Sequence, residues 1–241
     1  MAETRRYVAI DPASELEPQP PSRWGLWREA SVALEFAQLA LRYASLTRAK
    51  RNFQHPVVLF PGFGTSEAAM TVLHHYLKSI GAEVHHWGLG RNHGYVPDLL
   101  AQALKRVQQL AEAGRPVHLV GWSLGGYIAR EVARELPGQV ARVVTLGSPV
   151  VGGPKFTAVG KLYKSWGFDL EAMARDVERR SAVPIQNEIL AIYSQTDAVV
   201  DWQACIDQRS PNVTHAEVKG SHLGLMVNAK AFELVRDFLS A

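Results

Sequence analysis

The chain has 241 residues, 47% of them hydrophobic, which is enough for one α/β domain with a large core and too little for a second. Its 26 Lys and Arg against 23 Asp and Glu give a net charge of +3 that is spread along the chain, which argues against a nucleic-acid partner. The single cysteine, Cys205, excludes an intramolecular disulfide, and the first residues lack a charged segment followed by an apolar one. We therefore expect a cytoplasmic protein.

The N-terminal part, residues 1–54, predicts an arm followed by an amphipathic helix. Residues 1–22 are rich in Pro, Glu and Arg, which favours an irregular arm. A helix is expected over residues 24–46, where Glu35, Gln38 and Arg42 recur at helical spacing on one side and the rest is mostly apolar. Its charges make it a poor membrane span. The alternatives for this helix are packing on the domain, covering a pocket mouth, forming a homodimer, or peripheral membrane contact.

Residues 55–241 show alternating strands and helices, the pattern that a mostly parallel, doubly wound sheet requires. Strands are expected at 57–60, 83–87, 117–120, 143–146, 188–194 and 213–218. Helices are expected at about 66–80, at about 97–113, from 127 to at least 133, and at the C-terminus.

A G-x-S-x-G sequence, Gly121 to Gly125, lies between the third strand and the following helix. At such a sharp turn larger side chains collide, so the flanking glycines leave the serine hydroxyl exposed on a strained backbone. This context predicts a nucleophile elbow with Ser123 as the nucleophile. Trp122, beside it, is expected to pack under the turn.

A serine nucleophile needs a histidine base and a carboxylate that orients the base. In this type of fold the three follow the order Ser, acid, His, with the acid and the histidine after later strands. Asp197 leaves the strand 188–194, and His222 follows the strand 213–218. Asp201 is the alternative acid. The pairs His74-His75 and His85-His86 do not predict a metal site, because adjacent side chains diverge on helices and strands.

These residues make the chain resemble a serine lipase or esterase of the α/β-hydrolase superfamily, over roughly residues 55–240. Pro61 to Gly64 resembles the oxyanion loop of that family, although many members have His where this chain has Pro61. The resemblance implies oxyanion donors at the backbone N–H groups of Phe63 and Leu124. Arg91 or Asn92 is a candidate brace for this loop.

The segment 149–186 lies where the superfamily often carries a lid over the active site. Its apolar residues favour a lid that shapes the acyl pocket, with Phe156, Leu162 and Trp166 as pocket residues. The alternative is a plain helical crossover packed on the sheet.

The predicted function is hydrolysis of a small hydrophobic carboxylic ester through an acyl-serine intermediate, with no metal or organic cofactor. One alternative is an acyltransferase that uses the same triad. The other is a non-catalytic ligand-binding protein that keeps the fold.

Overall fold

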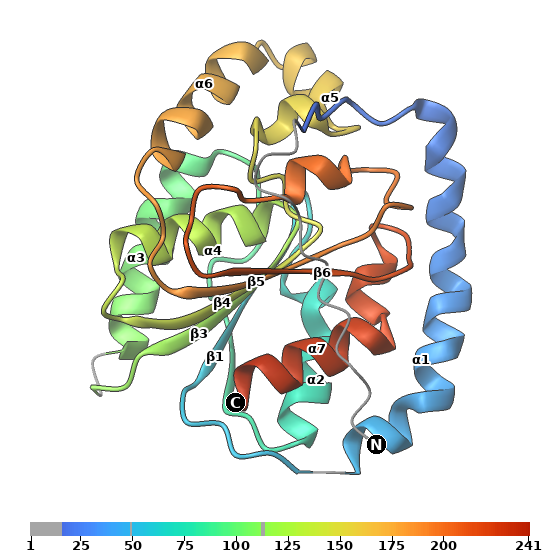
Figure 1. Ribbon diagram of the computed structural model, residues 1–241, viewed down its shortest axis with the longest axis vertical. Coiled ribbons are helices and arrows are strands. Elements are labelled where there is room, and N and C mark those ends of the chain that lie inside the picture. The colour runs from blue at the N-terminus through green and yellow to red at the C-terminus, as the bar shows by residue number, and fades with distance from the viewer. Residues whose placement is uncertain (1–15, 49, 112–113) are drawn as a thin grey trace.

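The computed structural model describes residues 16–48, 50–111 and 114–241, and in this part of the chain six strands form a single sheet (Figure 1). Their spatial order is β2-β1-β3-β4-β5-β6, and every neighbouring pair is parallel. The strands are β1 (Val57–Phe60), β2 (Val84–His86), β3 (Val117–Trp122), β4 (Val140–Leu146), β5 (Glu188–Tyr193) and β6 (Val213–Glu217). The predicted parallel sheet is confirmed. A strand lies at each of the six expected segments, although β3 extends to Trp122 and β4 begins earlier, at Val140.

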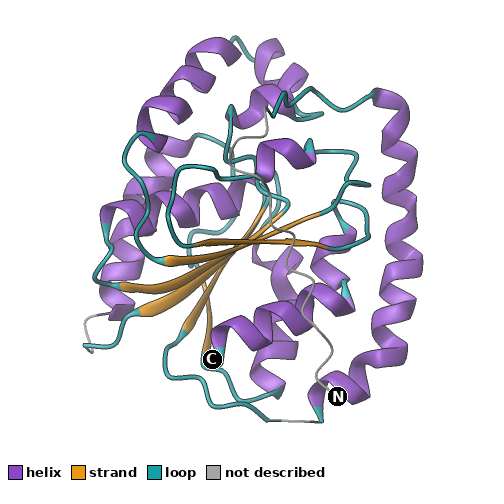
Figure 2. Cartoon of the chain, viewed as in Figure 1, coloured by secondary structure: helices purple, strands orange, loops and turns teal. Residues whose placement is uncertain are grey.

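Helices cover both faces of the sheet, as Figure 2 shows. On one face α2 (Thr71–Ser79) and α7 (Ala229–Leu239) pack on strand residues such as Leu59 and Val144, whereas α3 (Val96–Ala111) and α4 (Leu124–Glu135) pack on residues such as Val58 and Val143 on the other. Neighbouring residues of one strand thus point into opposite cores, which explains why the strands read as continuous apolar runs. The expected helix at 66–80 begins as a short 3-10 helix, η2 (Glu67–Met70).

The sheet order reverses at β1, because the chain passes from β1 to β2 on one side and later adds β3 on the other. In open α/β sheets, ligands bind beyond the carboxyl ends of the strands at such a reversal. The loop after β1 and the turn after β3 meet at this point. They carry the predicted oxyanion loop and the predicted nucleophile.

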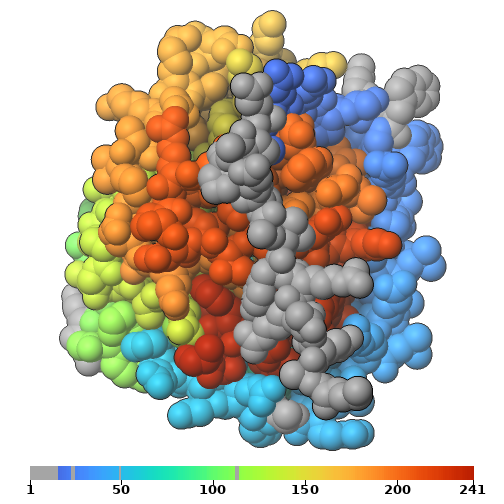
Figure 3. Space-filling model, in the orientation of Figure 1, coloured from blue at the N-terminus to red at the C-terminus, as the bar shows by residue number. Residues whose placement is uncertain are grey.

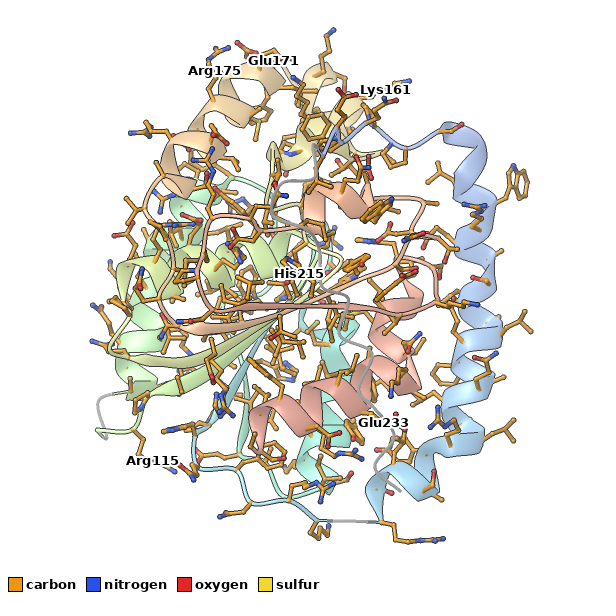
Figure 4. The ribbon with its side chains drawn as sticks, viewed as in Figure 1. Arg115, Lys161, Glu171, Arg175, His215 and Glu233 are labelled. Carbon is orange, nitrogen blue, oxygen red and sulfur yellow. The ribbon has the colours of Figure 1, made fainter. Side chains whose placement is uncertain are left out.

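The N-terminal helix runs along one side of the molecule, at the right in Figure 1. It begins as a 3-10 helix, η1 (Arg23–Ser31), and continues as α1 (Val32–Thr47). Leu39 and Leu46 are buried against the domain. The Arg42 guanidinium lies 2.6 Å from a carboxylate oxygen of Glu233 on α7. Glu233 is labelled in Figure 4. Of the alternatives for this helix, the structure shows packing on the domain. Residues 1–15 of the expected arm lie outside the described residues.

One expectation about this helix is wrong. Glu35 does not share an exposed side with Gln38 and Arg42: Glu35 is buried, while the apolar side chains of Leu34 and Leu41 are exposed. The physical reason is that Glu35 finds hydrogen-bond donors in the domain, which offset the cost of burying a carboxylate.

The insertion 149–186 folds as η3 (Gly153–Phe156), α5 (Gly160–Ser165) and α6 (Leu170–Ser181), which lie over the carboxyl ends of the strands at the top of Figure 1. Charged side chains, among them Lys161, Glu171 and Arg175 in Figure 4, lie on its outer surface beside exposed apolar ones such as Trp166. Two further 3-10 turns, η4 (Trp202–Cys205) and η5 (Gly224–Val227), follow β5 and β6. Within the described ranges, every helix is too short or too polar to span a bilayer.

Candidate active site

Ser123 occupies the sharp turn between β3 and α4 with φ 54° and ψ −127°. It is the one residue other than glycine with positive φ among the described residues. A Cβ at Gly121 would lie 2.4 Å from the backbone of Gly126, and a Cβ at Gly125 would lie 2.3 Å from the Phe60 carbonyl oxygen. The elbow therefore closes only with glycine at these positions, and the resulting strain presents Ser123 to the space above the sheet.

Asp197 and His222 meet beside this elbow. The Nδ1 atom of His222 lies 2.7 Å from Oδ2 of Asp197, and both side chains are almost fully buried. The other carboxylate oxygen, Oδ1, accepts the backbone N–H groups of Val199 and Val200 at 2.8 Å each. Because a carboxylate only accepts, Nδ1 carries the shared proton and Nε2 is left as the basic nitrogen.

Trp122 and Gly147 complete the surroundings of this pair. The Trp122 indole N–H donates to the His222 carbonyl oxygen at 3.1 Å, and the two rings lie 5.2 Å apart between centroids. A Cβ on Gly147 would come within 3.1 Å of Asp197 Oδ2 and 3.2 Å of His222 Nδ1. Trp122 is buried as expected, and its indole N–H links it to the histidine loop, but it also lines the cavity above Ser123.

The alternative acid, Asp201, has a different environment. Its Oδ1 accepts the backbone N–H of Gln203 at 3.0 Å, as the N-cap of η4, and its Oδ2 accepts that of Gln19 at 2.5 Å.

The single cysteine, Cys205, lies near these carboxylates. Burial raises the pKa of its thiol well above the usual value, and the negative charges of Asp197 and Asp201 add to the effect. This thiol therefore stays protonated, as expected of a structural cysteine.

The loop Pro61 to Gly64 lies against the elbow. A Cβ at Gly62 would come within 2.7 Å of the Trp122 ring and 3.2 Å of Ser123 Cβ. Asn92, which is fully buried, braces this loop. Its side-chain N–H donates to the Pro61 carbonyl at 2.8 Å, and its backbone carbonyl accepts the Gly64 N–H at 2.7 Å. Of the two candidate braces, Asn92 has these contacts.

Both predicted oxyanion donors are free in the described part of the chain. The backbone N–H groups of Phe63 and Leu124 have no acceptor there. The first N–H groups of a helix lack intrahelical partners, and Leu124 is the first residue of α4. Two free donors beside a serine hydroxyl are suited to bind a developing negative charge on oxygen.

A cavity of about 660 Å³ opens above Ser123 and His222, between the sheet and the insertion. This volume is in the usual range for a small-molecule site. Aromatic and aliphatic side chains dominate its wall: Phe63, Tyr95, Leu100, Tyr127, Val159, Tyr163, Phe168, Met173, Val177 and Val199. Tyr163 donates to the Gly94 carbonyl at 3.3 Å, and burial raises its pKa to about 12, so it is neutral.

The cavity wall corrects the predicted pocket residues, because Phe156, Leu162 and Trp166 are not part of it. Phe156 packs beside Tyr193 and Val200 on the flank of the sheet, whereas Leu162 and Trp166 are 40% and 54% exposed. The opposite sides of the short insertion helices face the cavity instead. Met173 and Val177, four residues apart on α6, both line the cavity. Their spacing places them on one side of the helix but does not tell which side faces the cavity.

Other histidines have contacts away from the Asp197–His222 pair. The ring Nε2 of His215 on β6, labelled in Figure 4, accepts the backbone N–H of Asp207 at 3.1 Å. His74 stacks on His86 with centroids 4.6 Å apart, and the described residues contain no cluster of three or more side chains suited to a metal ion.

Comparisons with known proteins agree with this fold. Residues 55–155 match the family model of the thioesterase domain. Over 68 residues the chain is 43% identical to the pimeloyl-[acyl-carrier protein] methyl ester esterase of Methylococcus capsulatus, and over 77 residues it is 34% identical to that of Photobacterium profundum. These matches cover 27% and 31% of this chain. They span only 25% and 29% of the two relatives.

Solved structures match over a much larger part of the chain. The lipase BlEst2 of Bacillus licheniformis has a TM-score of 0.62 at 16% identity, with 80% of this chain and 94% of the lipase covered. The monoacylglycerol lipase of Paleococcus ferrophilus has a TM-score of 0.57 at 17% identity, over 78% of this chain and 96% of the other. The resemblance to lipases and esterases is thus confirmed at the level of the fold, which is that of the α/β-hydrolases.

Proposed function

We propose that this chain, an α/β-hydrolase by fold, is a carboxylic ester hydrolase that works through an acyl-serine intermediate. The observation that carries the proposal is the 2.7 Å contact between Asp197 and His222, together with the presence of His222 and Ser123 in the wall of one cavity. Local sequence identity to two ester-hydrolysing relatives supports the same reaction type.

In the proposed reaction, His222 Nε2 accepts the Ser123 proton as the serine oxygen attacks the ester carbonyl. The N–H groups of Phe63 and Leu124 hold the oxyanion, and His222 then protonates the leaving alkoxide. Water activated by the same nitrogen releases the acid. Asp197 keeps the imidazole in the required tautomer and stabilises its charge. No step calls for a metal or an organic cofactor.

The substrate class follows from the cavity wall. Apolar side chains dominate it and a hydrophobic acyl group fits there, whereas a sugar or a highly charged acid would lose its hydration without hydrogen-bond partners. Asp176, Arg179 and Arg180 of α6 also line the cavity, yet Arg179 pairs with Asp176 and Arg180 with Glu131 and Glu135. These charges are largely neutralised by their own partners, so we assign the site to neutral esters.

The test is hydrolysis of p-nitrophenyl esters with two to sixteen acyl carbons, by the wild type and Ser123→Ala, together with fluorophosphonate labelling. We expect turnover and labelling of the wild type alone, while circular dichroism shows the same fold for both. A long-chain optimum would indicate a lipase and a short-chain optimum an esterase. Labelling without turnover in water, followed by product formation when an alcohol is added, would instead indicate acyl transfer. Absence of both labelling and turnover would leave a binding protein.

We also propose that the chain works in the cytoplasm, which its single, buried thiol supports. Fractionation of the producing cells tests this, and recovery outside the cytoplasmic fraction would contradict it.

A further inference from the structure

One carboxylate of the N-terminal segment bridges the loops that carry Asp197 and His222. Oε1 of Glu29, on η1, accepts the backbone N–H of His222 at 3.0 Å and that of Ala198 at 3.3 Å. Oε2 accepts the N–H of Leu223 at 2.9 Å. A residue 193 positions before the histidine in sequence therefore holds the main chain of both loops.

A second carboxylate, Glu35 on α1, holds the same loop one residue earlier. Its Oε1 accepts the Ser221 N–H at 2.7 Å, and its Oε2 accepts the Ser221 hydroxyl at 2.9 Å. The Ser221 hydroxyl oxygen in turn accepts the Gly224 N–H at 3.0 Å. Three consecutive N–H groups of the histidine loop, from Ser221 to Leu223, thus donate to carboxylates of the N-terminal helix.

We propose that Glu29 is a positioning residue for the triad, an inference that rests on the proposed function. The loop from β6 to η5 belongs to no regular element, so its N–H groups have no ladder to bind. Hydrogen bonds to an ionised acceptor are about twice as strong as neutral ones. Glu29 fixes His222 from its N–H side while Trp122 fixes it from its carbonyl side. The same oxygen bonds Ala198, next to Asp197, and this keeps the acid and the base at hydrogen-bonding distance.

The role of Glu29 is separable from attachment of the helix. The helix is also held by the buried Leu39 and Leu46 and by the Arg42–Glu233 ion pair, which joins α1 to α7 and not to the loops of Asp197 and His222. Glu233→Gln is therefore a matched control that weakens attachment and leaves the loop contacts intact. Glu29→Gln keeps the size of the side chain but leaves a single acceptor oxygen, and it turns an amide N–H₂ toward the loop. Glu29→Ala removes every acceptor.

The experiment compares kcat and KM for a p-nitrophenyl ester, and the melting temperature, in the full-length wild type and these three variants. A misplacement of about 1 Å at a reacting group costs on the order of 100-fold. We expect kcat to fall about 10- to 100-fold in Glu29→Gln and at least as far in Glu29→Ala, with KM changed less than about threefold. Glu233→Gln should keep the wild-type kcat even if its melting temperature falls.

A readout independent of turnover is the downfield proton resonance of the His222–Asp197 hydrogen bond. It should shift or broaden in Glu29→Gln and stay unchanged in Glu233→Gln. Wild-type kcat and an unmoved resonance in Glu29→Gln would overturn the inference while the hydrolase proposal stands. Equal losses of kcat in Glu29→Gln and Glu233→Gln would mean that Glu29 only attaches the helix to the domain. This result would also overturn the inference. A wild type without turnover or labelling would remove the proposed function, and the positioning role would fall with it.

Discussion

Asp197 and Asp201 are chemically identical and only four positions apart, yet their carboxylates have different hydrogen-bond partners in the fold. Asp197 accepts two backbone N–H groups with one oxygen and faces the imidazole with the other. Asp201 caps η4 and bonds Gln19. From sequence, Asp197 was favoured because it comes sooner after the strand and because the residues around it resemble the acid loop of the superfamily. The cap of Asp201 on η4 is a local contact with Gln203. Its bond to Gln19 joins a residue 182 positions away, which no local pattern contains.

This difference predicts the outcome of two matched substitutions. Asp197→Asn should lower kcat by roughly 10⁴-fold, because the amide no longer enforces the required imidazole tautomer. Asp201→Asn should leave kcat within about threefold, since asparagine is an equally good N-cap. Steady-state kinetics of both variants checks the pair, with circular dichroism to verify folding. A larger loss in Asp201→Asn would contradict the assignment of the acid.

At the scale of elements, the strands and the elbow were predictable because their signals are local. Apolar runs between turn residues predicted β1, β3 and β5. The glycines on both sides of Ser123 predicted the sharp turn between β3 and α4. The orientation of α1 was not predictable. From the sequence, Glu35 is expected at the surface because it is charged. In the structure it is buried, because the N–H and the hydroxyl of Ser221 donate to its carboxylate. Helical spacing shows that a helix has two sides and leaves open which side is buried.

The insertion shows the same limit. Its apolar composition indicated a pocket wall, but which residues face the cavity depends on how α5 and α6 rotate against the sheet. Phe168, Met173 and Val177 line the cavity. Leu162 is 40% exposed, and Trp166 packs behind the wall, with its ring 5.9 Å from that of Phe63. Its role as a lid stays a prediction.

The cavity wall predicts an effect on chain-length preference. Met173→Trp should fill the acyl space and move the optimum of the p-nitrophenyl series to shorter esters, with kcat/KM for the longest ester reduced about tenfold or more. Leu162→Ala, at a residue of the insertion that is 40% exposed and outside the cavity wall, is the control and should keep the wild-type optimum. If Leu162→Ala moved the optimum and Met173→Trp did not, the assignment of the cavity as the acyl site would be wrong.

At the scale of the whole molecule, the N-terminal helix has two unlike sides. Its inner side carries Glu29, Glu35 and Leu39 to the domain. Its outer side lies along the edge of the molecule, in blue at the right of Figure 3, and exposes 68% of Leu34 and 87% of Leu41. Burial of this apolar surface against a partner would contribute roughly 25 cal/mol for each Å² removed from water. We propose that this outer side contacts a partner.

The pattern of this outer side favours a second copy of the chain. Leu34 and Leu41 are seven residues apart, and the exposed Ala37 and Ala44 follow each of them by three positions. This spacing of large and small residues is that of paired helices, where the side chains of one helix fit between those of the other. A lipid surface requires apolar area but no such alternation.

We therefore expect the wild type to form a dimer through α1, and the double variant Leu34→Glu, Leu41→Glu to be a monomer in light scattering coupled to gel filtration. Val183→Glu, at an apolar residue that is 60% exposed outside α1, serves as the matched control and should remain dimeric. Because Glu29 and Glu35 point to the domain, the monomer should retain the wild-type kcat. A monomeric wild type that sediments with anionic vesicles, and loses this binding in the double variant, would assign the outer side of α1 to a membrane surface instead.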